Sequence, residues 1–141
     1  MIVIDSRNIN YFNKKIIKIE LKMMSYMSYN EIYNIEKKAN GKINVKISHS
    51  IDDLGFNVFL DKEEFNSYCD YLLEELKILN LKPEYRNDNI MDGYGWELKI
   101  EFEGGAKFES YGVNKKPRVI SKLIKSFKEI IFLQEKIFKK I

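Results

Sequence analysis

Residues Trp96 to Glu109 read WELKIEFEGGAKFE and decide the fold. Apolar and charged residues alternate on both sides of the turn 103–105, a period of two that is typical of half-buried β-strands. A three-residue turn there pairs Ile100 with Phe108 on the inner face. The same register predicts two opposite-charge pairs on the outer face, each worth about 0.2 to 1 kcal/mol: Glu101 with Lys107 and Lys99 with Glu109.

A second hairpin is predicted upstream of this stretch. Strands near 31–38 and 42–49 flank Ala39-Asn40-Gly41, and a three-residue turn with Gly41 in the left-handed conformation pairs Ile35 with Val45. A two-residue turn would instead place charged side chains opposite the apolar ones. Alternation also predicts a strand at about 15–24 and a short strand at 56–60.

Two amphipathic helices complete the expected elements. Asp61 and Glu64 have the spacing of a capping box, so a helix starts there and ends before Pro83. Its apolar stripe is Phe65, Tyr68, Cys69, Leu72, Leu73, Leu76 and Leu79. Residues 84–93 are predicted to be a polar loop. The last helix begins after Pro117, and its apolar residues fall within an arc of about 140°: Ile120, Leu123, Ile124, Phe127, Ile130, Ile131, Ile137, Phe138 and Ile141.

This order of elements predicts an α+β fold. We expect an antiparallel sheet of four to five strands with two helices packed on one face, arranged as two β-hairpin-plus-helix units. The length of 141 residues and the 45% hydrophobic content fit a single domain over 1–141. Within it, residues 1–14 are expected to form a loosely ordered arm, 15–82 the strands plus helix, and 92–141 the hairpin plus basic amphipathic helix.

Several function classes lack their usual residues. The one cysteine, Cys69, and the one histidine, His49, leave no Cys/His set for a zinc site. Cys69 lies on an apolar stripe, where cysteine is an inert core residue, and no nucleophile accompanies His49. No apolar run is long enough to span a bilayer, and the first residues lack a signal-peptide pattern. We therefore expect a cytoplasmic protein that is not an enzyme, with no catalytic residues, no cofactor, no metal and no membrane partner.

Positive charge is concentrated in the last helix. The net charge is +3, but the residues from 115 onward have nine basic against two acidic side chains, a net charge of +7. The preference for Lys, Ile, Asn and Tyr indicates an AT-rich genome, as in a low-GC bacterium or its phage. Phe132 lies in or beside the basic stripe, and exposed apolar groups among cations favour a contact surface. The predicted partner-binding residues are Lys122, Lys125, Lys128, Phe132, Lys136 and Lys139.

The first third of the chain provides a second candidate surface, made of Tyr26, Tyr29 and Tyr33. Aromatic side chains that the core does not use commonly form contacts with partners. Two alternatives to a protein-binding basic helix stay open. The lysines could be an ordinary solvated face, or they could contact the phosphates of a nucleic acid.

Residues 92–117 carry a recognisable module. It consists of Asp92-Gly93-Tyr94, Trp96, Leu98, Ile100, Phe102, Gly105, Ser110, Gly112, Asn114 and Pro117. The module resembles one found in small uncharacterised α+β proteins of low-GC Firmicutes and their mobile elements, except that Lys116 stands where that family has a Tyr before the Pro. The resemblance implies a structure rather than an activity.

These features lead to one leading hypothesis and one alternative. The leading hypothesis is a non-catalytic macromolecule-binding module from a low-GC bacterium or its phage, with a protein as its partner. Small phage-borne inhibitors of bacterial defence, such as anti-CRISPR proteins, have a similar size and composition, so inhibition of a host defence complex is one role for it. The alternative is a nucleic-acid-binding protein that uses the basic C-terminal helix.

Overall fold

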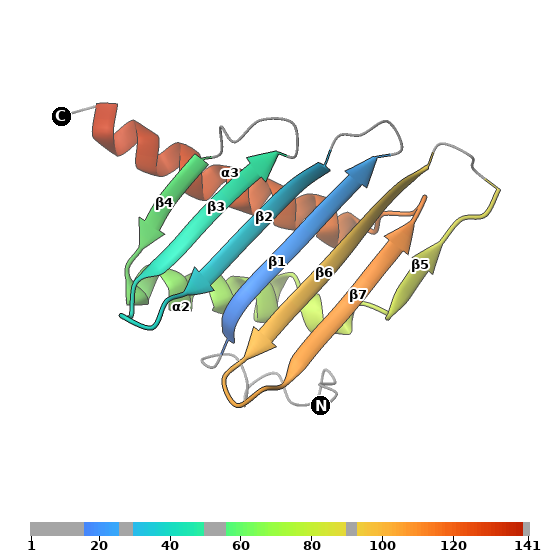
Figure 1. Ribbon diagram of the computed structural model, residues 1–141, viewed down its shortest axis with the longest axis horizontal. Helices are drawn as coiled ribbons and strands as arrows, with labels where there is room; N and C mark the ends of the chain where they lie inside the picture. The colour runs from blue at the N-terminus through green and yellow to red at the C-terminus, as the bar shows by residue number, and fades with distance from the viewer. Residues whose placement is uncertain (1–15, 26–29, 50–55, 90–92, 140–141) are drawn as a thin grey trace.

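The computed structural model describes residues 16–25, 30–49, 56–89 and 93–139, with only the backbone described at 56 and 132–139. Seven strands form one sheet in the order β4-β3-β2-β1-β6-β7-β5 (Figure 1). The strands are β1 (Ile16–Ser25), β2 (Asn30–Lys37), β3 (Ile43–His49), β4 (Phe56–Leu60), β5 (Glu84–Arg86), β6 (Tyr94–Phe102) and β7 (Lys107–Val113). The α+β class is confirmed.

Both predicted hairpin registers are confirmed. Ile35 pairs with Val45 across β2 and β3, and Ile100 pairs with Phe108 across β6 and β7. On the outer face the predicted charge pairs lie in register, and the Nζ of Lys107 is 3.6 Å from the carboxylate of Glu101. Gly41 has a φ of 84°, the left-handed conformation that its turn requires.

The sheet differs from the expected one in size and in type. It has seven strands rather than four to five, and it is mixed rather than purely antiparallel, because β5 pairs in parallel with β7. The prediction of a loop over 84–93 was therefore wrong at residues 84–86. Backbone hydrogen bonds flank β5 on both sides. The Tyr111 N–H donates to the Pro83 carbonyl and the Asn87 N–H donates to the Val113 carbonyl, both at 3.0 Å.

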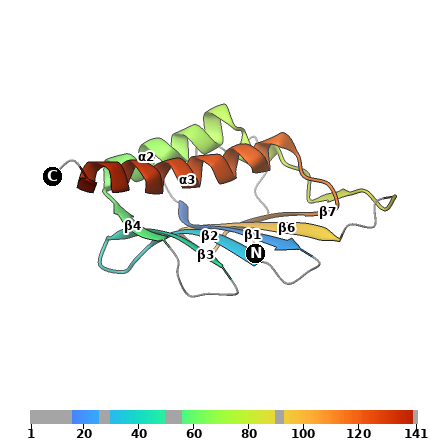
Figure 2. The ribbon, with the colours of Figure 1, turned by 90° about the horizontal axis from the view of Figure 1, so that it is seen from above.

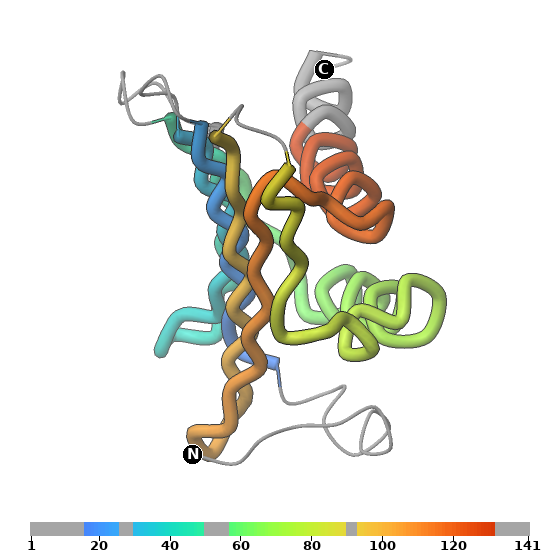
Figure 3. The backbone as a smooth tube through the Cα atoms, turned by 90° about the vertical axis from the view of Figure 1, so that its right-hand side faces the viewer, coloured from blue at the N-terminus to red at the C-terminus, as the bar shows by residue number. Residues whose placement is uncertain are grey.

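Among the described residues, two α-helices cover one face of the sheet, as predicted (Figures 2 and 3). The first, α2 (Lys62–Asp70), begins with the expected capping box between Asp61 and Glu64. It does not continue to Pro83 as one α-helix. A π-helical turn, η3 (Tyr71–Glu75), follows it, Lys77 then takes a φ of 51° that ends the segment, and a short 3-10 helix, η4 (Ile78–Asn80), comes next.

The second helix, α3 (Arg118–Lys139), crosses behind the upper ends of the strands in Figure 1. The core lies between the two helices and the sheet, and it contains all seven residues of the first predicted helix stripe. From α3 it takes Ile120, Leu123, Phe127 and Ile131, whereas Ile124 and Ile130 are half-buried. Within the described ranges, no helix is long and apolar enough to cross a membrane.

Candidate partner-binding surface

The start of α3 is fixed to the sheet by the segment that links it to β7. Asn114 adopts a φ of 55° and makes two reciprocal bonds with Tyr94. Its backbone N–H donates to the Tyr94 carbonyl at 2.9 Å, and its side-chain oxygen accepts from the Tyr94 N–H at 3.0 Å. The indole N–H of Trp96 donates to the Lys115 carbonyl at 2.8 Å. Together these bonds hold the chain where it leaves the sheet.

Gly112 allows this arrangement because it has no side chain. A Cβ at this position would lie 2.1 Å from the indole nitrogen of Trp96 and 2.5 Å from the Lys115 carbonyl oxygen. We call Tyr94, Trp96, Gly112 and Asn114 the junction clamp. All four belong to the module singled out in the sequence, and in this chain their role is to place α3.

Contacts with aromatic rings set the rotation of α3 about its own axis. Phe127 is fully buried and packs edge-on against Tyr33 at 5.7 Å and against Tyr68 at 6.0 Å between ring centroids. One residue earlier, the Ser126 hydroxyl lies 2.5 Å from the Tyr68 hydroxyl and donates to the Leu123 carbonyl at 2.7 Å. Since this side of α3 faces the core, the lysines must face outward.

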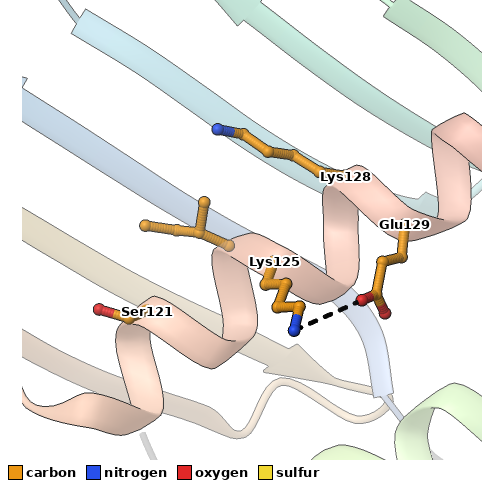
Figure 4. Close-up of a pocket in the computed structure, with 5 residues that line it drawn as sticks. Ser121, Lys125, Lys128 and Glu129 are labelled. Carbon is orange, nitrogen blue, oxygen red and sulfur yellow. Dashed lines mark ion pairs between the residues drawn. The ribbon is translucent and has the colours of Figure 1, made fainter.

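Three of the predicted site residues are exposed on α3, namely Lys122, Lys125 and Lys128. Lys125 and Glu129 form an ion pair at 4.0 Å (Figure 4), but both side chains are largely exposed, at 78% and 61%. A pair this exposed contributes little to stability. For Lys136, Lys139 and Phe132 the helix backbone is described, whereas their side chains lie outside the described part of the structure.

Tyr33 is the residue of the second candidate surface that the structure describes. It is 1% exposed and belongs to the core, and it also lines a cleft between the strand ends and α3. The alternation that places Ile35 inward puts Tyr33 there as well, because side chains two residues apart share a face. Tyr26 and Tyr29 lie outside the described residues.

Three adjoining hollows surround the exposed side of α3. The ridge hollow, about 440 Å³, lies along the helix itself, where Ser121 and Lys128 point to one side and Lys125 and Glu129 to the other (Figure 4). The helix groove, about 310 Å³, lies between α3 and the π-helical turn. The sheet cleft, about 380 Å³, lies between α3 and the ends of β1, β2 and β6.

Shared residues make these hollows one surface. Lys125 and Glu129 line both the ridge hollow and the helix groove, whereas Ile124 and Lys128 line both the ridge hollow and the sheet cleft. The helix groove is lined by Glu75 and Glu129 and by Lys122 and Lys125, so it carries both signs of charge. The surface combines exposed cations with half-buried apolar groups.

Sequence reasoning missed the π-helical turn and the sheet cleft. Tyr71 and Glu75 line the helix groove from the turn, and Leu76 lines it from the position after the turn. Turns of this kind occur often at functional sites. Nothing in the spacing of the apolar residues distinguishes such a turn from an α-helix, because the stripe still recurs at three or four residues. The sheet cleft takes residues from four separate segments, which a linear pattern does not bring together.

Burial keeps two titratable groups near this surface, the Cys69 thiol and the Tyr68 hydroxyl, in the neutral form. Burial raises the pKa of the Cys69 thiol to about 12, and burial also raises the pKa of the Tyr68 hydroxyl. A thiol with such a pKa is a poor nucleophile at neutral pH. Among the described residues, no group of three or more His, Cys, Asp and Glu side chains is placed to hold a metal ion.

Comparison with known proteins gives no relative from which a role could be transferred. No protein-family model, no curated protein and no solved structure matches this chain. A functional assignment therefore depends on the surface itself.

Proposed function

We propose that the protein is a non-catalytic binding module that holds an acidic protein partner on the exposed side of α3. The observation that carries the proposal is the position of Ile124, a half-buried apolar residue in the same hollow as Lys125 and Lys128. Cations attract an acidic partner, and an apolar group between them gains free energy only when the partner covers it.

The biological setting is part of the same proposal. A low-GC bacterium or its phage is the expected source, because the composition favours residues with AT-rich codons. In that setting we propose a cytoplasmic protein, and inhibition of a host defence complex is the role that fits a small binding module without catalytic residues. This role requires only occupation of a surface on the target.

Nucleic acid is the second candidate partner, and one observation favours it. Lys115, Lys116 and Arg118 are exposed just before and at the start of α3, and Lys122 follows one turn later. Such a cluster can contact consecutive phosphates. Lysine contacts to phosphate depend on charge alone, so this mode of binding would be weak and insensitive to sequence.

A nuclease-treated pull-down from the native host tests the proposal. The test variant carries Lys122→Glu, Lys125→Glu and Lys128→Glu, and the control carries Lys37→Glu, Lys46→Glu and Lys62→Glu, which are exposed elsewhere and change the net charge equally. We expect wild type and control to retain the same protein and the test variant to lose it, with circular dichroism showing all three folded.

Two results of this pull-down would count against a protein partner. The first is retention of the same protein by all three forms, which would make the lysines a solvated face. The second is loss of all bound material on nuclease treatment, together with an affinity for nucleic acid that falls steeply with salt. That second result would establish the alternative function.

A further inference from the structure

We propose that the sheet cleft is the specificity pocket of this surface, and that it takes a large apolar side chain of the partner with an Asp or Glu next to it. This inference rests on the proposed function, because the occupant is a segment of the acidic protein partner. It goes beyond that function by naming the chemistry of the segment.

The shape of the cleft fits one or two side chains. Its volume of about 380 Å³ is in the range of ligand-binding pockets. In Figure 1, α3 crosses behind the strands, and the residues that line the cleft come from both layers of the fold, from the ends of β1, β2 and β6 and from α3. The junction clamp holds one wall of the cleft, because Tyr94 belongs both to the clamp and to the cleft.

Apolar groups line much of the cleft. Met23 and Met24 contribute from β1, Tyr94 from β6 and Ile124 from α3. All four residues are half-buried, so a bound side chain would remove further apolar surface from water. Methionine side chains are flexible and polarizable and therefore adapt to differently shaped apolar groups. An aromatic or long aliphatic side chain meets these requirements.

The charges of the cleft require an anion beside that apolar group. Lys116 and Lys128 contribute two ammonium groups, and Glu31 contributes one carboxylate, which accepts a hydrogen bond from the Tyr33 hydroxyl. One positive charge is therefore in excess, and a single carboxylate balances it.

Glu31 also explains why a peptide fits better than a nucleic acid. Its carboxylate lines the cleft, so a phosphate chain would bring several negative charges against it. A peptide brings one carboxylate for the lysines and backbone N–H groups that can donate to the carboxylate of Glu31. The lysines of α3 alone would attract either a peptide or a nucleic acid. The carboxylate of Glu31 in the cleft favours the peptide.

A peptide selection tests this inference without knowledge of the native partner. A phage library of random 12-residue peptides is selected on the immobilised wild-type protein. We expect enriched peptides to contain Phe, Trp, Leu or Met within two positions of Asp or Glu. The leading sequence is then made with a fluorescent label, and its affinity is measured by anisotropy against the protein variants.

Neighbouring residues provide the matched variants. Lys116 lines the cleft, whereas Lys115 is an exposed lysine that does not. We expect Lys116→Glu to weaken peptide binding about tenfold or more and Lys115→Glu to change it less than about twofold. Replacing the acidic residue of the peptide by its amide, or its apolar residue by Ala, is expected to weaken binding to wild type by a similar factor.

Three outcomes would overturn the inference: no enriched motif, a motif without an acidic residue, or equal effects of Lys116→Glu and Lys115→Glu. A labelled 12-nucleotide single strand that displaced the peptide at lower concentration than unlabelled peptide would overturn it as well. These failures are distinguishable from failure of the proposed function. One result would separate the two proposals: Lys116→Glu keeps the full affinity for the native partner, while the triple Glu variant at Lys122, Lys125 and Lys128 loses it. In that case α3 binds the partner, but the sheet cleft is not its specificity pocket.

Discussion

At the scale of single residues, Gly112 is a position with no room for a side chain. In Gly112→Ala the new Cβ must displace either the Trp96 ring or the Lys115 backbone, because it would lie 2.1 Å and 2.5 Å from them. Since Trp96 is fully buried, we expect a loss of about 3 kcal/mol in the free energy of unfolding, the upper end for overpacking. Urea unfolding measures it. Tyr111→Ala, at the exposed neighbour, is the control, and an equal loss in both would contradict this role for Gly112.

The buried thiol of Cys69 predicts how the stability of the fold depends on pH. The pKa of its thiol is about 12 in the folded protein and about 9 in the unfolded chain. Between these values the unfolded chain releases the proton and the folded protein keeps it, so stability is complete below about pH 9 and falls as the pH rises toward 12. Tyr68 acts in the same direction, because burial raises its pKa too.

Thermal melts of wild type and Cys69→Ala at pH 7 and pH 10.5 test this prediction. The variant is expected to be less stable at pH 7, because it loses buried volume, and the difference is expected to narrow at pH 10.5. The maximum slope for one proton is about 1.4 kcal/mol per pH unit. A constant difference at both pH values would show that the Cys69 thiol does not titrate as described.

At the scale of elements, a buried polar contact between Tyr68 and Ser126 joins α2 to α3. Ser126 donates its only hydroxyl proton to the Leu123 carbonyl, so the Tyr68 hydroxyl is the donor in the contact between Ser126 and Tyr68. Ser126→Ala leaves the Tyr68 hydroxyl buried without this acceptor, which costs about 1 to 3 kcal/mol. Tyr68→Phe removes the donor itself and is expected to cost only about 1 kcal/mol.

A double-mutant cycle in urea checks this prediction. In the double variant Tyr68→Phe with Ser126→Ala, no hydroxyl is left without its partner, so its loss of stability is expected to be no larger than that of Ser126→Ala alone. Strictly additive losses would mean that the two hydroxyls are not coupled across the helices.

The elements also show where the sequence suffices for prediction. The hairpin registers were predictable because a shift of one residue would turn Ile35 or Ile100 to the wrong face. The strand β5 was not, because it is only three residues long and two of them, Glu84 and Arg86, are exposed and ion-paired with each other at 2.8 Å. Its pairing with β7 depends on where the chain runs after η4, which is a tertiary property.

At the scale of the whole molecule, the two faces differ in charge. On the open face of the sheet, cations and anions alternate from strand to strand: Lys107, Glu101, Lys18 and Glu36 in one row, and Glu109, Lys99 and Glu20 in the next. Such a row attracts no partner of one sign. The helix α3 lies on the other side of the sheet (Figure 3), and Lys122, Lys125 and Lys128 are exposed on it, so an acidic partner is directed to the helix side.

The candidate site could be predicted from the sequence only in part. The helical period of 3.6 residues was enough to place Lys122, Lys125 and Lys128 outward, because the apolar arc of the same helix had to face the sheet. In β2, the period of two that turns Ile35 inward turns Tyr33 inward as well, so its burial was predictable. The hollows beside α3 were not predictable, because Lys116 and Glu31 are distant in sequence and line one cleft only in the folded protein.

The dissociation constant of the captured protein partner tests the central claim most directly. It is measured by biolayer interferometry for wild type, for the triple Glu variant at Lys122, Lys125 and Lys128, and for the triple Glu control at Lys37, Lys46 and Lys62. If α3 is the binding surface, the first variant binds about 100-fold more weakly or worse, and the control binds within about threefold of wild type. Equal affinities for the two folded variants would contradict the claim.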